Sequence, residues 1–390
     1  MAKAFRSIAP VILSVALLAL TACSGGNSGL SAPGNTIQTL PNSPQTAAVA
    51  GSNSNRDLFT SDTVSVLNQL DNKQTIGSTV DPTNGDQNPY GLDVAKVNNG
   101  LFEAGDLVVC NFNDRANIQG NGTTIIALHP RPGSQPVRVA QNHSLKGCDW
   151  IALAPDDTIW AAAFVSNENP ILDTFGNLLT ELSNGPWHRP FGQAFSPTAG
   201  PFGGGAFYET NAADGSLVRV NLTSGPFTFD IIATGFAVNH GAPGGILGPS
   251  GMEYDVQHDR LYIVDGADNT LVAFNGVSSI PAGGIVVHGK TFSGPFAGRA
   301  HLIFAGPPLN GPISAALLPG GHLVLGNTLD PAGKNLMVEI TPAGKMLAVK
   351  NVDTGAAGAI FGMVATGATL HDTKLYFNDD NDNTVKVLTP

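Results

Sequence analysis

The stretch at residues 248–276 reads GPSGMEYDVQHDRLYIVDGADNTLVAFNG. Short runs rich in β-branched and aromatic residues alternate in it with turn residues at 258–259 and 265–269, which predicts three short antiparallel strands. The stretch recurs, because LYFNDDNDNTV at 375–385 matches LYIVDGADNTL at 261–271 in its Leu, Tyr, Asp, Asn and Thr positions. A looser copy begins at Tyr208. The copies indicate a repeat of roughly 50 residues, typical of one four-stranded propeller blade.

The amino-acid composition and the spacing of turn residues extend this pattern to the whole chain. The 390 residues include 47 Gly and 27 Pro, and no stretch has helical periodicity with caps. The expected blade starts are Pro89-Tyr90-Gly91, Asp149-Trp150, Pro190-Phe191-Gly192, Pro249-Ser250-Gly251, Pro312-Ile313 and Ile360-Phe361-Gly362. We interpret the recurring Pro-x-Gly as a sharp turn into each innermost strand. The prediction is an all-β, six-bladed β-propeller, with seven blades as the alternative.

The two ends of the chain predict how the ring closes. The last blade has only three recognisable strands, around residues 360–364, 375–378 and 384–388. Two strand-like pieces, at 63–67 and 74–78, precede the first complete blade. We expect the N-terminal strand to complete the last blade, because a closed ring leaves no bare strand edge.

The motifs at 249–274 carry a resemblance to a known family. Pro-Ser-Gly-Met, Leu-Tyr-Ile-Val-Asp and Asp-Asn-Thr-Leu resemble the NHL repeat and its relatives in the six-bladed, gluconolactonase-like superfamily. The resemblance extends more loosely to 311–340 and 360–388 and is thin at 89–190. It implies a central channel and a ligand face formed by the loops that lead into the innermost strands. It implies no single reaction, because this fold hosts binding modules, hydrolases and lyases.

Candidate ligand-face residues follow from this resemblance. Gluconolactonase relatives hold a divalent cation with oxygens near the starts of innermost strands, where this chain offers only Asp149 and Glu253. Four histidines are expected in connections between successive blades on one face, where imidazoles could bind zinc or copper: His143, His188, His240 and His301. No metal site is assigned, and a divalent metal stays open as a cofactor. The aromatic and apolar residues at 90, 150, 191 and 361 suggest a channel mouth plugged by side chains. The acidic run at 379–383 lacks the EF-hand pattern and is interpreted as a turn.

The N-terminus resembles the signal peptide of bacterial lipoproteins. Lys3 and Arg6 precede an apolar run at 8–20, and LTAC at 20–23 resembles a lipobox. The family pattern implies cleavage after residue 22 and acylation, with palmitate among the acyl groups, of Cys23. Residues 24–55 carry no charge and are rich in Ser, Gly, Asn, Pro and Thr, so 23–55 is expected to be a disordered tether and 56–390 the propeller. The alternative is an ordinary signal peptide with a chance cysteine.

The other two cysteines, Cys110 and Cys148, are expected at adjacent blades on one face. Because an exported protein meets an oxidising compartment, we predict a disulfide between them. The alternative is a pair of free buried thiols.

The net charge and the motifs that are missing limit the classes of function that the sequence allows. The net charge of −11, without a basic stripe, argues against nucleic acid as a partner. Neither a Gly-x-Ser-x-Gly elbow nor an HExxH helix is present. The predicted function is a non-enzymatic module of the cell envelope, lipid-anchored at the outer membrane and binding a small molecule or protein. The alternative is a metal-dependent hydrolase or lyase of the gluconolactonase-like type.

Overall fold

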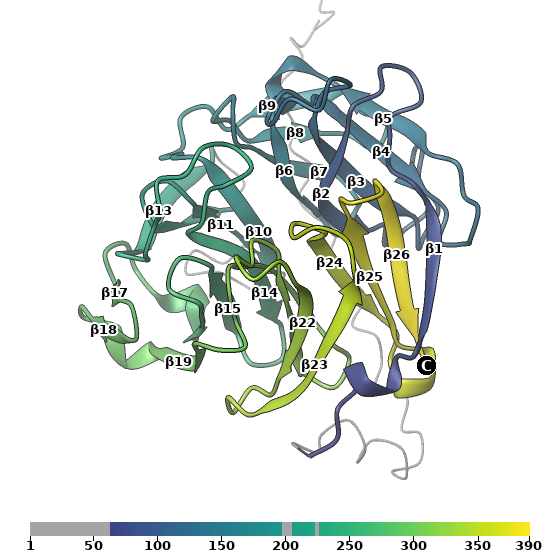
Figure 1. Ribbon diagram of the computed structural model, residues 1–390. Coiled ribbons are helices and arrows are strands. Elements are labelled where there is room, and N and C mark those ends of the chain that lie inside the picture. Colours follow the sequence, from purple (N-terminus) through teal and green to yellow (C-terminus); the bar gives the residue numbers. More distant parts are fainter. Residues whose placement is uncertain (1–62, 197–204, 223–225) are drawn as a thin grey trace, which may run out of the picture. The chain divides into compact units, whose positions relative to one another are not determined.

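The computed structural model describes residues 63–196, 205–222 and 226–390, all within the compact unit Leu40–Pro390. Their strands form six sheets arranged around a common centre (Figure 1). The innermost strands contact one another in ring order, and the last contacts the first. The six-bladed β-propeller predicted from the sequence is therefore confirmed, and the seven-bladed alternative is wrong.

Each predicted blade start lies on an innermost strand. From the inside outward, blade 1 consists of β2 (Gln87–Val94), β3 (Leu107–Asn113), β4 (Thr124–Leu128) and β5 (Val137–Gln141), and blade 2 of β6 (Cys148–Leu153), β7 (Ile159–Ala163), β8 (Pro170–Leu172) and β9 (Leu178–Glu181). Blade 3 consists of β10 (Pro190–Ser196), β11 (Ala206–Asn211), β12 (Ser216–Asn221) and β13 (Thr228–Thr234), and blade 4 of β14 (Pro249–Asp255), β15 (Arg260–Asp265), β16 (Thr270–Asn275) and β19 (Ala300–Ala305). Blade 5 consists of β20 (Pro312–Leu317), β21 (Leu323–Asn327), β22 (Asn335–Ile340) and β23 (Met346–Asp353), and blade 6 of β24 (Ile360–Thr366), β25 (Lys374–Asp379), β26 (Thr384–Thr389) and β1 (Asn72–Ser78).

One insertion departs from the four-stranded pattern. The connection between β16 and β19 contains a hairpin of β17 (Ile285–His288) and β18 (Thr291–Ser293). This hairpin does not extend its own blade, because β17 pairs in parallel with β13 of blade 3. Blade 3 therefore has six strands, and the hairpin ties blades 3 and 4 together at their outer edges.

The glycines of the Pro-x-Gly motifs have a different role from the turn that we expected. Every innermost strand has a β-bulge near its start, so the backbone of each blade approaches the next blade closely. A Cβ on Gly192 would lie 1.9 Å from the Ser250 carbonyl oxygen, and one on Gly251 would lie 2.6 Å from the Ile313 carbonyl oxygen. These glycines have no positive φ. Glycine is required here because neighbouring innermost strands leave no space for a side chain.

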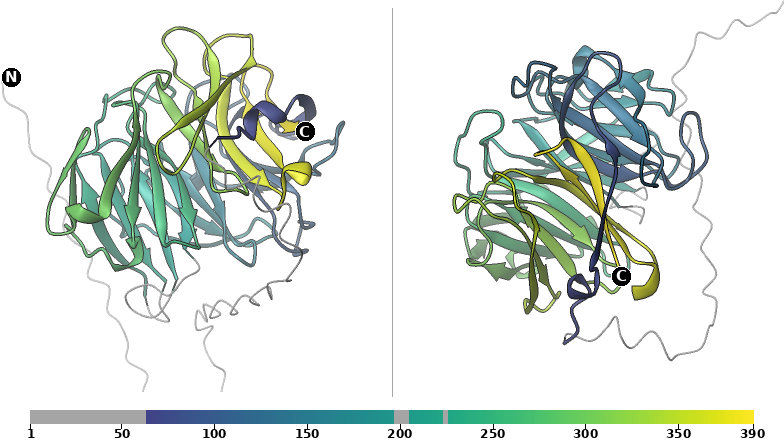
Figure 2. Two further views of the ribbon diagram at one scale, coloured as in Figure 1. Left: turned by 90° about the horizontal axis from the view of Figure 1, so that it is seen from below. Right: turned by 45° about the vertical axis from the view of Figure 1, so that its right-hand side comes forward.

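The N-terminal strand closes the ring as predicted. β1 pairs antiparallel with β26, from Asn72 opposite Thr389 to Ser78 opposite Thr384. Figure 2 shows the two ends of the described chain side by side in this blade. β1 also reaches blade 1, because the Ser134 amide donates to the Ile76 oxygen at 3.0 Å.

The piece at 63–67 is not a strand, contrary to our expectation. It leads into the 3-10 turn η1 (Leu67–Gln69), which docks on blade 5. The buried Glu339 carboxylate accepts hydrogen bonds from the amides of Val66 at 3.0 Å and Leu67 at 2.9 Å, and from the Ser65 hydroxyl at 2.5 Å. His322 Nδ1 lies 2.8 Å from the same carboxylate. Burial by itself raises the pKa of Glu339, but these hydrogen bonds leave that pKa below its usual value. We call residues 65–78 the clasp, because they join blades 5, 6 and 1.

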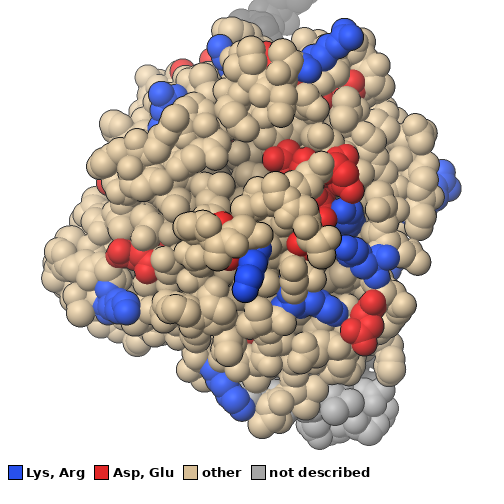
Figure 3. All heavy atoms as spheres, in the orientation of Figure 1, with Lys and Arg blue, Asp and Glu red and all other residues tan. Residues whose placement is uncertain are grey.

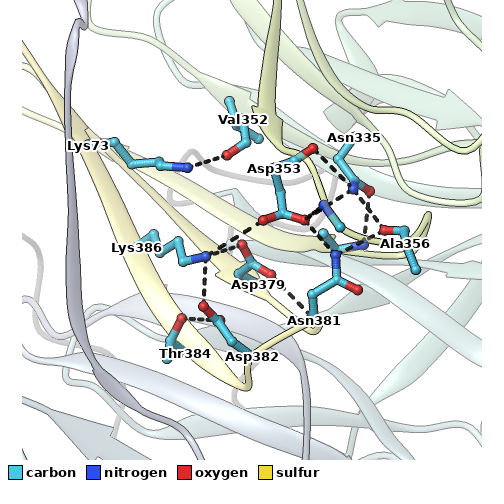
Figure 4. A network of polar contacts seen from close by, with 12 residues as sticks. Lys73, Asn335, Val352, Asp353, Ala356, Asp379, Asn381, Asp382, Thr384 and Lys386 are labelled. Carbon is cyan, nitrogen blue, oxygen red and sulfur yellow. Dashed lines mark hydrogen bonds and ion pairs between the residues drawn. The ribbon is translucent and has the colours of Figure 1, made fainter.

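The acidic run at 379–383 forms a turn, as we interpreted it. The Asn381 amide donates to Asp379 Oδ1 at 3.1 Å. The ammonium group of Lys386 lies among three carboxylates, 2.5 Å from Asp379, 2.9 Å from Asp382 and 3.9 Å from Asp353 (Figure 4). The cation that these carboxylates face is thus supplied by the chain itself.

Helices play a minor part in the described residues. They amount to five 3-10 turns of three residues each. None of the described helices has the length and apolar character needed to cross a bilayer.

Candidate functional site

The channel mouth is closed by a ring of side chains at the six bulges. The unpaired bulge positions hold four apolar residues, Tyr90, Phe191, Ile313 and Phe361, and two polar residues, Asp149 and Ser250. Because a bulge re-aims its side chain, each blade directs one residue toward the common centre. The apolar members pack into one buried cluster with Phe112, Trp150, Phe164 and Ile246, which we call the plug.

The plug is an aromatic assembly. The Tyr90 ring stacks on Phe361 with centroids 3.7 Å apart and on Phe112 with centroids 4.2 Å apart. Phe112 meets the edge of Phe164 at 6.1 Å. The plug that the sequence suggested is therefore present.

A loop of the blade 3–blade 4 connection covers the plug. Residues 239–247 reach across to blade 1, where a Cβ on Gly244 would lie 2.6 Å from the Gln119 side chain. Ile246 joins the plug and is buried. A cavity of about 10 Å³ remains, and both Gly244 and Ile246 line it. This volume is about that of one water probe, so the closed mouth has no room for an organic ligand.

Asp149 is an uncompensated acid within this apolar ring. Its side chain is fully buried, and among the described residues no other side chain donates a hydrogen bond to either carboxylate oxygen. Burial, followed by the neighbouring Cys110 and Glu209, raises the pKa of Asp149 well above its usual value. The buried surroundings therefore favour the neutral form of this carboxyl group.

A second buried acid was missed in the sequence. Glu209 on β11 accepts hydrogen bonds from Asn169 and, at 3.3 Å, from Gln193, and Gln193 also donates to Asn169 at 2.9 Å. All three side chains are buried between blades 2 and 3, and burial raises the pKa of Glu209 well above its usual value. Isolated polar residues on strands look like solvent-facing positions, so nothing in the sequence marked this network.

Glu253 lies away from the plug. It is three residues after the bulge residue Ser250 on β14 and pairs with Tyr262. It is half-buried, and burial, with a smaller effect of Asp93, raises its pKa to about 8. Asp149 and Glu253 therefore occupy different levels of the innermost strands.

The four histidines do not form one site. His143, His188 and His240 are exposed and lie in successive connections that lead into blades 2, 3 and 4. His301 does not, because it lies on β19, the outermost strand of blade 4. The expectation for His301 was wrong because the β17–β18 hairpin lengthens this blade.

The residues present do not fit the divalent cation that the resemblance implies. A hard cation takes six or more oxygen ligands, whereas four of the six bulge positions of the ring hold apolar residues. No group of three or more His, Cys, Asp or Glu side chains in the described residues could hold a metal ion. We derive no metal-dependent step from this geometry.

The two cysteines lie together between blades 1 and 2. Cys110 is on β3, and its Sγ donates to the Cys148 backbone oxygen at 3.1 Å. Burial and the neighbouring Cys110 thiol raise the pKa of Cys148 well above its usual value. Both are free thiols in this structure.

The Cys110–Cys148 disulfide stays a prediction, and peptide mapping tests it. A bridge would close a loop of about 38 residues and stabilise the fold by roughly 3–4 kcal/mol in the chain-entropy model. Non-reducing digestion of protein secreted into an oxidising compartment should yield the linked peptides. Recovery of both thiols in alkylated form would show that the residues serve only in packing.

The raised pKa values predict that mild acid stabilises the fold. Burial is the main cause that raises the pKa of Asp265 to about 6, of Asp380 to about 7 and of Glu253 to about 8. The folded state therefore binds more protons than the unfolded state between these values and about pH 4, so stability falls as pH rises. Urea unfolding should give a higher midpoint at about pH 5 than at about pH 9. Glu253→Gln should reduce the change of the urea midpoint with pH near pH 8. A midpoint that rises with pH would contradict the raised pKa values of these carboxyl groups.

The surface carries few charges. On the face shown in Figure 3, Lys and Arg side chains are scattered and most of the surface is uncharged. This face offers no continuous row of cations of the kind that neutralises a phosphate backbone.

Comparisons with known proteins show which solved structures share this fold. No protein-family model and no curated protein matches the chain. An auxiliary nutrient binding protein from Bacteroides thetaiotaomicron is 11% identical, with a TM-score of 0.52, over 81% of this chain and 75% of that one. A luciferin-regenerating enzyme is 11% identical, with a TM-score of 0.50, over 82% and 95%. A virginiamycin B lyase from Staphylococcus aureus is 16% identical, with a TM-score of 0.48, over 82% and 99%. The chain thus shares a six-bladed β-propeller fold with solved proteins of different activities.

Proposed function

We propose that this protein is a lipid-anchored binding module of the cell envelope, with an NHL-like propeller as its folded part. The observation that carries the proposal is the plugged channel mouth. Aromatic side chains and Ile246 of loop 239–247 fill the channel mouth near the starts of the innermost strands. A surface of loops above a filled channel suits recognition of a ligand more than catalysis. The nutrient-binding protein among the structural neighbours supports this class of function.

The ligand face in this proposal is the face of the connections into blades 2, 3 and 4. These connections carry the exposed side chains of His143, His188 and His240. Loop 239–247 belongs to the same set of connections. Asp149 lies beneath them in the ring of bulge residues.

The anchor is tested at Cys23, which lies outside the described residues. Cells fed a clickable fatty acid should label the wild-type protein and not Cys23→Ala. The variant should also leave the membrane fraction, because acyl chains supply the binding free energy. Equal labelling of the two proteins would contradict lipidation, and an outer-membrane position is then tested by fractionation of the two membranes.

Two measurements on the purified soluble domain distinguish the binding module from the alternative, a metal-dependent hydrolase or lyase. A binding module should contain less than stoichiometric metal by elemental analysis, and a panel of small solutes should raise its melting temperature. One tightly held divalent cation per chain, together with ester or lactone turnover that a chelator abolishes, would favour the enzyme.

A further inference from the structure

A groove lies on blade 1, at the face of the ring opposite the channel mouth. It is formed by the connection 95–106, between β2 and β3, and the connection 129–136, between β4 and β5. β2 begins with its bulge at the mouth and β4 runs in the same direction, so both strands end at the other face. The volume of the groove is about 370 Å³, within the range of small-molecule pockets. The residues that line it are Glu103, Ala104, Asp106, His129, Pro130 and Arg131.

Backbone hydrogen bonds make the first wall of the groove rigid. The Glu103 amide donates to Asp106 Oδ2 at 2.9 Å, and the Asp106 amide donates to the Glu103 oxygen at 3.0 Å. The Ala95 amide donates to the Asp106 oxygen, and the Gly105 amide donates to the Ala95 oxygen, both at 2.8 Å. Asp106 is only 3% exposed. Its carboxylate is therefore a fixed, buried acceptor at the base of the groove.

Asp106 determines which nitrogen of His129 is available to a ligand. His129 Nδ1 lies 2.7 Å from Asp106 Oδ1. A carboxylate only accepts hydrogen bonds, so this contact assigns the proton of the neutral imidazole to Nδ1. Nε2 then carries the lone pair, and among the described residues no group donates to it. Because the His129 side chain is 42% exposed, Nε2 is an acceptor that a ligand can reach.

Two opposite charges on the walls of the groove are also free to bind a ligand. The side chains of Glu103 and Arg131 are exposed, and neither has a hydrogen bond or ion pair to another described residue. The Glu103 carboxylate and His129 Nε2 are two acceptors for an N–H donor. The Arg131 guanidinium is a planar cation, which pairs with a carboxylate through two parallel hydrogen bonds. Carboxylates outnumber guanidinium groups in the groove, which disfavours phosphate and other multiply charged anions.

We propose that this groove binds a free α-amino acid as its zwitterion. Arg131 pairs with the carboxylate of the amino acid, and Glu103 and His129 Nε2 accept hydrogen bonds from its ammonium group. Asp106 is a positioning residue, because it acts through the imidazole. Ala104 and Pro130 form the apolar part of the walls and suit an aliphatic side chain. The proposal goes beyond the proposed function, because it adds a second site on the opposite face of the ring.

The test compares leucine with two analogues on the full-length chain. 4-Methylpentanoate lacks the ammonium group of leucine, and 3-methylbutan-1-amine lacks its carboxylate. Calorimetric titration should show leucine binding more tightly than either analogue by about tenfold or more, because each analogue loses one set of charge-assisted hydrogen bonds. No binding of leucine, or equal affinity for the three compounds, would overturn the proposal.

Three substitutions assign the groups in the groove. Glu103→Gln should remove the advantage of leucine over 4-methylpentanoate, and Arg131→Gln should remove its advantage over 3-methylbutan-1-amine. Asp106→Asn should weaken leucine binding and leave 4-methylpentanoate unchanged. The reason is that the Glu103 amide needs the oxygen of the new carboxamide, so its NH₂ group faces Nδ1 and moves the imidazole proton to Nε2. Equal weakening of both compounds would overturn the positioning role of Asp106.

Arg115→Gln is the matched control for Arg131→Gln. Arg115 is an exposed arginine in the connection between β3 and β4, at the channel-mouth face of the same blade. This substitution should leave all three affinities unchanged. Equal leucine affinity in the wild type, Glu103→Gln and Arg131→Gln would place the amino acid elsewhere and overturn the proposal. The solute panel tests the ligand face separately, so the proposed function stands if only this groove fails.

Discussion

Deletion of residues 24–80 should abolish cooperative folding of the propeller as a monomer. This deletion removes the clasp, which buries the side chains of Val66, Leu67, Leu70 and Ile76. At about 1.5–3 kcal/mol for each buried side chain, the loss is on the order of 6–12 kcal/mol. That loss equals the whole stability of an ordinary domain. It also bares the edge of β26 and leaves the Glu339 carboxylate without its partners in the clasp.

Deletion of residues 24–55 is the control. These residues lie before the clasp and carry no charged side chain, so the melting temperature should change little. Thermal melts and gel filtration of both truncated proteins decide the matter. If the protein lacking residues 24–80 is also monomeric and has the melting temperature of the wild type, the clasp does not close the ring.

Gly192→Ala should produce the second-largest loss of stability. The new Cβ would lie 1.9 Å from the Ser250 carbonyl oxygen and 2.6 Å from its carbon, and both belong to the backbone of the next blade. The two innermost strands would have to separate, which also disturbs the Thr210 hydroxyl, 3.2 Å from the same oxygen. We expect a loss of about 3 kcal/mol or more, measured by urea unfolding.

Gly298→Ala is the matched control for this substitution. A Cβ on Gly298 would have nothing within 4 Å, and its φ is not positive. The control should be within about 0.5 kcal/mol of the wild type. Equal effects of the two substitutions would show that the close approach of blades 3 and 4 does not require glycine.

The blade count was predictable because the signals that mark an innermost strand are local. Pro-x-Gly occurs at three of the six starts, and the ring closure follows from counting strands at the two ends. Asp149 and three aromatic members of the plug, Tyr90, Phe191 and Phe361, were also visible, since they occupy one repeated position. The turn role given to the glycines was wrong, because the chain itself does not show which backbone will lie beside it.

Other features depend on contacts that no local pattern reveals. The β17–β18 hairpin pairs with β13, about 50 residues earlier, through only a short parallel register. Because the hairpin lengthens blade 4, its outermost strand β19 contains His301, where we expected the connection into the next blade. The piece at 63–67 has the composition of a strand but is held by Glu339, more than 270 residues away.

The clasp also determines how a mechanical load would spread through the molecule. Residues 63–78 precede the ring along the chain, so a pull transmitted along the backbone from the N-terminal side reaches the clasp first. Tension there would first load the hydrogen bonds to Glu339. It would then load the hydrogen bonds that the Lys350 ammonium donates to the backbone oxygens of Leu67, at 3.1 Å, and Leu70, at 2.5 Å. It would next meet the β1–β26 ladder of blade 6 and the contact of Ile76 with blade 1. Force applied at one point is therefore shared among three blades, and the ring resists being peeled open from its seam.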